Sequence, residues 1–286
     1  MASLSNRVWT ILDIINWGKD YLSNYGISNS KLELEWFLAD LLNCNRIDLY
    51  VRFEEPLNTY ELNRIRDFIK RRQQHEPFQY ILKKAPFYGY EFYVSPAVLI
   101  PRPETETLID LTKKLGINTN FLEVGTGSGC IAITLLKENI FHSGIAIDIC
   151  KNALKIAQKN VINTSVNNLN FFELDFLKDE LNQSFDCIIS NPPYIPQKEL
   201  IKLEKNVIKY EPKIALTDSG DGLSFYNRFA EVGKKILNYN GYMLLETGGE
   251  SQINEINQIF LNLDYFTKVH KDQNNEKRFI EIRINH

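Results

Sequence analysis

The sequence predicts an α/β protein in which a small all-α N-terminal domain precedes a largely parallel, doubly wound sheet. Three observations predict this class. Residues up to about 84 carry helical patterns and almost no strand patterns, an aromatic stretch then has the pattern of a β-hairpin, and after Asn118 short apolar strands alternate with helices. We therefore divide the chain into a helical domain at 1–84, a hairpin linker at 85–105 and a sheet domain at 106–286.

Composition bounds the class of protein. A chain of 286 residues that is 44% hydrophobic and 24% charged can bury a substantial core. Its net charge of −3 gives no overall attraction to nucleic acid, although the run KRRQQH at 70–75 allows a local basic face. The N-terminus lacks a secretory pattern, and no apolar run approaches the ~18 residues of a membrane span. We expect a cytoplasmic monomer without membrane or stable nucleic-acid binding.

The cysteines predict no metal site. They lie far apart in mostly apolar surroundings, with no CxxC pair and no histidine cluster to complete a zinc site. We interpret all of them as reduced thiols: Cys44, Cys130, Cys150 and Cys187.

The helical domain is predicted from two amphipathic stripes. The first opens at Ser30, which forms a potential capping box with Glu33, and the second opens at a box of Asn58 with Glu61 and stops before Pro77. The apolar positions at helical spacing are Leu34, Phe37, Leu38, Leu41 and Leu42 in the first and Leu62, Ile65, Phe68 and Ile69 in the second.

The remaining elements follow in order. The stretch FYGYEFYVS turns at Gly89 as a hairpin, and a helix follows near 105–115. Strands are predicted in FLEVG, GIAIDI, LNFFEL, FDCIIS and YMLLE, with helices from Gly129, from Lys151 and near 223–237. The segments DYFTKVH and KRFIEIRI fit a closing antiparallel pair.

A glycine-rich turn follows the first strand of the sheet. Gly125, Gly127 and Gly129 allow positive φ and a close approach of ligand to backbone, which alone is a weak signal. About 25 positions after Glu123, the next strand ends in Asp148, whose carboxylate can accept both hydroxyls of a ribose. Loop and acid together predict a cofactor that contains a nucleoside; an ordinary βα turn with a strand-end acid is the alternative.

The choice of cofactor rests on two residues. A dinucleotide fingerprint requires glycine or alanine where this chain has Cys130. Glu123, just before the glycines, would repel phosphate but suits a cofactor with a sulfonium and an ammonium group. S-adenosylmethionine therefore fits better than NAD, which stays the second candidate.

A further acid follows the third strand. Asp175 can accept from the exocyclic amine of an adenine, and Phe176 can stack on its ring. A helix N-cap followed by a core aromatic residue is the other interpretation of this pair.

The stretch NPPY ends the strand FDCIIS. Its two prolines cannot continue a central strand, so Asn191 should lie where the strand stops and a rigid loop begins. The Asn191 oxygen and the Pro192 carbonyl can accept both N–H groups of a planar amide or aromatic amine, while Tyr194 packs over it. This arrangement would position an NH₂ group against a sulfonium methyl.

With these residues in this order, the chain resembles the class I methyltransferases with an NPPY motif. The segments EPFQYILKKAPFYGYEFYVSPAVLIPRPETE, FLEVGTGSG, AIDI, SNPPYI, YEPKIAL and DGLSFY are similar to the HemK/PrmC glutamine methyltransferases of translation release factors. The resemblance covers nearly the whole chain and is most specific in LIPRPETE and NPPYI. It implies a Rossmann-like methyltransferase sheet and transfer of a methyl group from S-adenosyl-L-methionine to the glutamine side chain in the release factor's GGQ loop.

The resemblance also implies roles for residues and domains. Residues 1–84 would dock the release factor, and 106–286 would carry the chemistry. The expected cofactor-binding residues are Glu123, Gly125, Thr126, Gly127, Ser128, Gly129, Asp148, Asp175, Phe176 and Asn191. The expected substrate-binding residues are Asn191, Pro192, Pro193 and Tyr194, of which Asn191, Pro192 and Tyr194 are catalytic.

Other segments of the resemblance lie around the site. Arg102, Glu104 and Glu106 of PRPETE would lie near its mouth, where a salt-bridged hinge is an alternative to a direct role. Glu211 with Pro212 is expected to brace the NPPY loop. The segment DSGDGL lacks the spacing of a calcium loop and predicts a loop and a helix start.

The chain departs from the family pattern at three positions. His75 and Lys83 stand where the family commonly has glycine, and Pro86 replaces the usual acid before the aromatic residue. These positions bear on partner contact and leave the predicted chemistry intact.

Three competing functions stay open at this point. An adenine-N6 methyltransferase needs the same acceptors for an exocyclic amine, but the acidic balance and the missing target-recognition domain argue against it. A glutamine methyltransferase acting on a ribosomal protein is opposed by the N-terminal match. A module that only binds S-adenosylmethionine would leave the NPPY geometry without a purpose.

Overall fold

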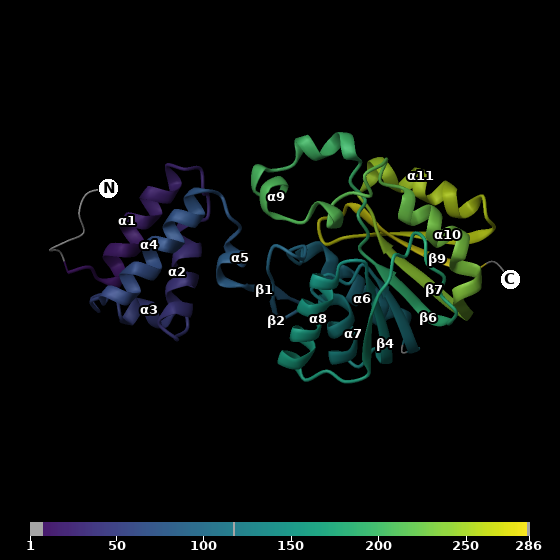
Figure 1. Ribbon diagram of the computed structural model, residues 1–286, viewed down its shortest axis with the longest axis horizontal. Coiled ribbons are helices and arrows are strands. Elements are labelled where there is room, and N and C mark those ends of the chain that lie inside the picture. Colours follow the sequence, from purple (N-terminus) through teal and green to yellow (C-terminus); the bar gives the residue numbers. More distant parts are fainter. Residues whose placement is uncertain (1–7, 117, 285–286) are drawn as a thin grey trace. The chain divides into compact units, whose positions relative to one another are not determined.

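The computed structural model describes residues 8–116 and 118–284, and the chain divides into two compact units (Figure 1). The first unit ends at Lys83 and the second begins at Lys84. The predicted hairpin therefore falls within the second unit. The two units are described in turn.

The first unit is helical, as its apolar stripes predicted. Its helices are α1 (Ile11–Ser23), α2 (Ser30–Leu41), α3 (Asp48–Val51), α4 (Thr59–Gln73) and α5 (Phe78–Leu82). They enclose one core, in which Phe37 stacks on Phe68 with ring centroids 4.2 Å apart. The predicted capping box of Asn58 and Glu61 is confirmed, because each side chain accepts from the other residue's backbone N–H at 2.8–3.0 Å.

The capping box predicted at Ser30 and Glu33 is wrong. The N-cap is Asn29, and the Ser30 hydroxyl instead donates to the Lys19 carbonyl at 3.1 Å. Glu33 is drawn away by the buried Arg72, whose Nε lies 2.6 Å from its carboxylate. Arg72 belongs to the basic run at 70–75, so a local basic face there has less free charge than its sequence indicates.

The second unit contains the predicted α/β sheet. Its strands lie in the order β5-β4-β3-β6-β7-β9-β8, and β9 runs antiparallel to all the others. The strands are β3 (Asn118–Val124), β4 (Phe141–Asp148), β5 (Leu169–Glu173), β6 (Phe185–Ser190), β7 (Leu237–Glu246), β8 (Tyr265–Lys271) and β9 (Lys277–Ile284). The closing antiparallel pair is thus confirmed. A separate hairpin of β1 (Lys84–Phe87) and β2 (Tyr90–Tyr93) turns at Tyr88 and Gly89.

Helices cover both faces of this sheet (Figure 1). One face packs against α6 (Glu106–Leu115), α7 (Cys130–Lys137) and α8 (Lys151–Thr164), and the other against α10 (Ser224–Ile236) and α11 (Glu250–Leu261). Successive residues of β3 alternate between the cores, with Phe121 in the first and Leu122 in the second. This burial on both sides explains why the strands are continuous apolar runs.

The chain reverses its winding between β3 and β6. β4 and β5 lie on one side of this pair and the later strands on the other, so the two strands border the topological switch point. Val124 and Ser190 are register partners at their carboxyl ends. The residues that follow directly, Gly125 and Asn191, therefore leave the sheet side by side.

Candidate active site

A cavity of about 560 Å³ lies at the carboxyl ends of the parallel strands. Its wall includes the glycine loop, Asp148, Phe176, Asn191 and a segment around Ile214, all from the second unit. A ligand bound there would touch loops that follow four different strands, as is usual at a switch point.

The glycine loop has the backbone that its sequence predicted. Gly125, Gly127 and Gly129 have φ of 74°, 55° and 80°. A Cβ at either of the first two would meet no atom within 4 Å, so a ligand can approach the backbone there. A Cβ at Gly129 would lie 3.1 Å from Ala157, which makes this glycine a packing requirement between α7 and α8.

Glu123 lies buried beneath this loop. Its carboxyl accepts from the Thr126 hydroxyl at 2.6 Å and from the backbone N–H of Ala132 at 3.2 Å. Burial raises the pKa of Glu123 to about 8, and the two hydrogen bonds only partly oppose this. A cation in the cavity would favour ionisation of this acid, as predicted for a cofactor with positive groups.

Asp148 bridges the two loops next to it. One carboxylate oxygen accepts from the N–H of Gly127 at 2.9 Å and the other from the N–H of Cys150 at 2.8 Å. Burial raises the pKa of Asp148, and both N–H donors oppose the shift. Each oxygen keeps a lone pair that can accept from a hydroxyl group, so the Asp148 carboxylate fits the two hydroxyls of a ribose.

The helix N-cap interpretation of Asp175 is wrong, because a turn and no helix follows it, whereas Phe176 is the core aromatic residue of that interpretation. Asp175 accepts from the N–H of Leu177 at 3.1 Å in a local turn, and Lys178 lies 2.8 Å from its carboxylate. Phe176 is buried against Phe229 at 4.5 Å between ring centroids. Both residues also line the cavity, so contact with an adenine remains a prediction.

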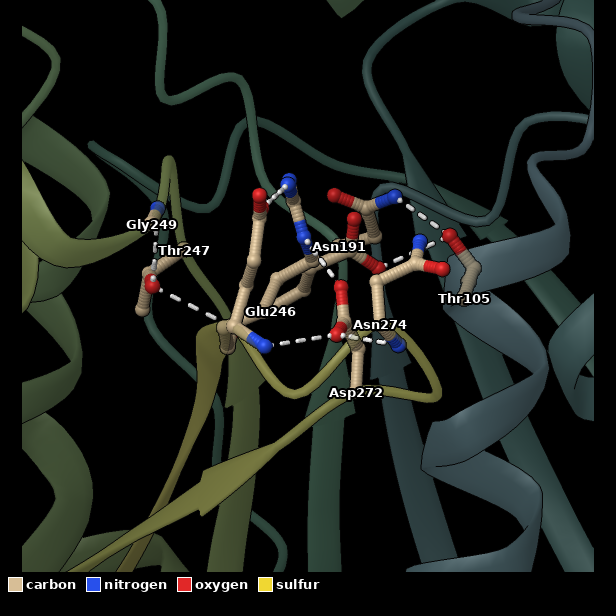
Figure 2. A network of polar contacts seen from close by, with 9 residues as sticks. Thr105, Asn191, Glu246, Thr247, Gly249, Asp272 and Asn274 are labelled. Carbon is tan, nitrogen blue, oxygen red and sulfur yellow. Dashed lines mark hydrogen bonds and ion pairs between the residues drawn. The ribbon is translucent and has the colours of Figure 1, made fainter.

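Asn191 begins the loop after β6 and is held from one side. Its Nδ2 donates to the Thr105 hydroxyl at 3.1 Å, and this hydroxyl donates to the Glu246 carboxylate at 2.8 Å (Figure 2). Both partners are buried, and neither was identified from the sequence. Thr105 lies within PRPETE and Glu246 ends an apolar strand, which are the only sequence signals for them.

The rest of NPPY is rigidly supported. Pro193 lines the cavity, whereas Pro192 and Tyr194 lie outside the lining that the described residues form. The Tyr194 carbonyl accepts from the Gln252 side chain at 3.0 Å, and burial raises the pKa of the Tyr194 phenol. A Cβ on Gly222 would lie 2.2 Å from the same carbonyl, so this glycine leaves room for the loop.

Two flanking segments stabilise the mouth of the cavity. Arg102 pairs with the buried carboxylate of Glu211 at 2.7 Å. Ile195, just after NPPY, donates its N–H to the Leu216 carbonyl at 3.0 Å. Asp218 accepts from several N–H groups ahead of α10, so DSGDGL is the predicted loop and helix start. No cluster of metal-ligating side chains occurs among the described residues.

The sheet order, the glycine loop and the strand-end acid around this cavity define a Rossmann-like, S-adenosylmethionine-dependent methyltransferase. Residues 13–82 match the model of the PrmC N-terminal domain, and residues 103–253 match that of the methyltransferase small domain. The chain belongs to the release factor glutamine methyltransferase family.

Relatives in several bacteria support this membership. The release factor glutamine methyltransferase of Geobacter sulfurreducens is 37% identical over 243 residues, which are 85% of each chain. That of Fusobacterium nucleatum is 35% identical and covers 94% of this chain and 77% of its own. A bifunctional methyltransferase of Rickettsia typhi is 37% identical, but this chain spans only 57% of it.

Solved structures agree on the fold of the second unit. A methyltransferase from Pyrococcus furiosus superposes with a TM-score of 0.53 at 20% identity, over 70% of this chain and 91% of that one. A ribosomal protein L11 methylase from Lactobacillus delbrueckii gives a TM-score of 0.50 at 17% identity, over 68% and 84%. Among the described helices, none is both long and apolar enough to cross a membrane.

Proposed function

We propose that the chain methylates the side-chain amide nitrogen of the glutamine in the GGQ loop of a translation release factor. Asn191 carries this proposal, because it leaves β6 beside the glycine loop with its Nδ2 engaged by Thr105 and its Oδ1 available to accept. The release factor names of the relatives support the same substrate. We further propose that residues 1–84 dock this partner and that the enzyme acts in the cytoplasm as a monomer, without stable nucleic-acid binding.

The cofactor would be held by the cavity-lining residues at the carboxyl ends of β3, β4 and β5. The glycine loop gives close backbone approach, Asp148 suits the ribose hydroxyls, Glu123 suits a positive group, and Phe176 with Asp175 suits the adenine. When bound, S-adenosylmethionine supplies a methyl carbon that the amide nitrogen takes while the broken carbon–sulfur bond leaves its electron pair on sulfur.

Residues after β6 would prepare the glutamine amide. We expect the Asn191 oxygen and, from outside the described cavity lining, the Pro192 carbonyl to accept its two N–H groups and orient the nitrogen, whose lone pair is otherwise delocalised. The same acceptors stabilise the positive charge that develops on nitrogen during transfer. The methylated nitrogen then loses one N–H proton to water, so no strong general base is required.

The test measures transfer of labelled methyl to a purified release factor. Three other acceptors are run beside it: the same factor with the GGQ glutamine changed to alanine, adenine-containing DNA, and RNA. Asn191→Ala should lower kcat by roughly 10² to 10³, as for the loss of one preorganised polar group, and leave S-adenosylmethionine affinity largely intact. Label on nucleic acid in place of the release factor would overturn the substrate. An equal loss of cofactor affinity would overturn the role of Asn191.

A further inference from the structure

We propose that Thr105 and Glu246 determine which end of the Asn191 amide faces the cavity, so that Thr105 is a positioning residue for methyl transfer. This inference rests on the proposed function of Asn191 as an acceptor. The role of Thr105 and Glu246 would be to keep the Asn191 oxygen, and not its NH₂ group, directed at the substrate.

The geometry joins three segments that are remote in sequence. Asn191 follows β6, Thr105 ends the 3-10 turn ahead of α6, and Glu246 ends β7 (Figure 2). Thr105 is 3% exposed and Glu246 is 1% exposed, so water does not compete for their hydrogen bonds. Thr105 also lines the cavity next to Asn191.

A count of protons fixes the direction of the chain of hydrogen bonds. An ionised carboxylate only accepts, so the single hydroxyl proton of Thr105 must go to Glu246. Thr105 then presents only lone pairs to Asn191, and only the NH₂ end of the amide can bond to it. The oxygen of Asn191 is thereby directed away from Thr105. The reverse orientation would place two acceptors, the Asn191 and Thr105 oxygens, against each other without a hydrogen bond. We call this series of hydrogen bonds, from Asn191 through Thr105 to Glu246, the relay.

Protonation of Glu246 would remove the preference for one orientation of the Asn191 amide. A neutral carboxyl can donate its own proton to Thr105, which frees the Thr105 proton for donation to Oδ1, so that either end of the Asn191 amide can bond to this hydroxyl. Burial raises the pKa of Glu246 to about 7, opposed by the hydrogen bond from Thr105. The charged and titratable groups that face it are Arg278 of β9, Arg102 and Glu104 ahead of α6, Tyr194 of the NPPY loop and Tyr226 of α10. The acceptor should therefore lose its orientation as the pH falls below neutrality.

Three variants test the relay in the full chain. Thr105→Val removes the hydroxyl at nearly constant shape and should lower kcat roughly tenfold without changing the KM for S-adenosylmethionine. Thr105→Ser should restore kcat. Glu246→Gln cannot titrate, so the fall of kcat with acid should disappear in this variant, whichever end of the glutamine amide meets Thr105. An acid limb that persists in Glu246→Gln would overturn the proposal.

Thr107 offers a matched control two residues along. Its hydroxyl is also buried, but it has no hydrogen-bond partner among the described residues. Thr107→Val should therefore leave kcat unchanged. A loss of kcat in this variant equal to that of Thr105→Val would mean that any buried change near the start of α6 lowers the rate, and would overturn the specific role of Thr105.

A spectroscopic measurement separates this proposal from the substrate assignment. The side-chain amide signals of Asn191, assigned by their loss in Asn191→Ala, should shift with pH near neutrality in the wild-type chain and not in Glu246→Gln or Thr105→Val. If the wild-type chain labels nucleic acid or nothing, the proposed function fails while this readout still decides the relay. If the wild-type chain labels the release factor, but its Asn191 amide signals neither shift with pH nor change in Thr105→Val, then only the relay is refuted.

Discussion

The Ser190 hydroxyl donates a hydrogen bond of 2.7 Å to the carbonyl of Val124, across the last register pair of β6 and β3. Ser190 is fully buried, so this bond ties two neighbouring strands directly below the loops that they support. The glycine loop begins at the next residue of one strand and NPPY at the next residue of the other. The spacing between the glycine loop and Asn191 is therefore set inside the sheet.

Ser190→Ala should lower the free energy of unfolding by about 1 kcal/mol, because it removes one buried hydrogen bond. Ser143→Ala on β4 is the control, since that hydroxyl makes only a long, exposed contact of 3.5 Å. Urea unfolding of both variants measures the difference. Equal midpoints would show that the Ser190 bond contributes nothing to the strand ends.

Gly129→Ala should destabilise the fold by about 1–3 kcal/mol, because a non-glycine residue at φ 80° is strained. The new methyl group would also press on Ala157 and Ile133 at 3.1 Å. Gly220→Ala is the control, since its Cβ would meet its nearest neighbour at an ordinary 3.4 Å. Thermal unfolding compares the two. An unchanged Gly129→Ala protein would contradict the packing role given to this glycine.

Because the pKa of Glu123 is raised, we expect the free energy of unfolding to fall as the pH rises. Its pKa is about 8 in the folded protein against an ordinary value of 4.5, so between these values the folded state holds a proton that the unfolded chain has lost. The stabilisation is complete below about pH 4.5 and is lost as the pH rises through 8. Glu246, with a pKa of about 7, acts in the same direction.

Glu123→Gln should flatten most of this dependence, since glutamine still accepts from Thr126 but does not titrate. Urea unfolding at about pH 5 and about pH 9 measures it in both proteins. The affinity of the wild-type chain for S-adenosylmethionine should rise over the same range, because the ionised form attracts a cation. A wild-type stability that is level with pH would refute the neutral state of Glu123.

His75→Gly and Lys83→Gly should each stabilise the first unit by about 0.5–1 kcal/mol. Both residues are exposed and adopt left-handed φ of 62° and 59°. Relief of about 1–2 kcal/mol of strain exceeds the entropy of about 0.5–1 kcal/mol that glycine adds to the unfolded chain. Lys155→Gly in α8 should instead destabilise by about 1 kcal/mol. Calorimetry of the three variants would reject this reasoning if all shifted Tm in the same direction.

Most of the sheet could be predicted because its signals are local. Strands buried on both faces are short apolar runs such as FDCIIS, and turns with glycine or proline mark where they end. Helix α11 was missed because ESQINEINQIFL is largely polar, and its inward residues Ile253, Ile256 and Phe260 make a sparse stripe. The Ser30 box failed because Arg72, 39 residues from Glu33, competes for the same carboxylate.

The site residues also divide into some that local patterns predict and some that they do not. Gly125, Asp148 and Asn191 each lie at the carboxyl end of a recognisable strand, so sheet topology brings them together without further information. Thr105 and Glu246 join Asn191 through contacts that span 86 and 141 residues. No local pattern encodes such pairs, because the packing of the whole second unit creates them.

The position of β9 between β7 and β8 has a consequence for the nascent chain on a ribosome. β8 is synthesised first, yet β9 provides its only pairing in the sheet. Without β9, β8 lacks a strand partner among the described residues and β7 is left as an open edge carrying Met243, Leu244 and Leu245. An unpaired apolar edge of this kind is prone to pair with other chains. A nascent chain released before Lys277 lacks β9 and should therefore keep this edge open and be prone to aggregate.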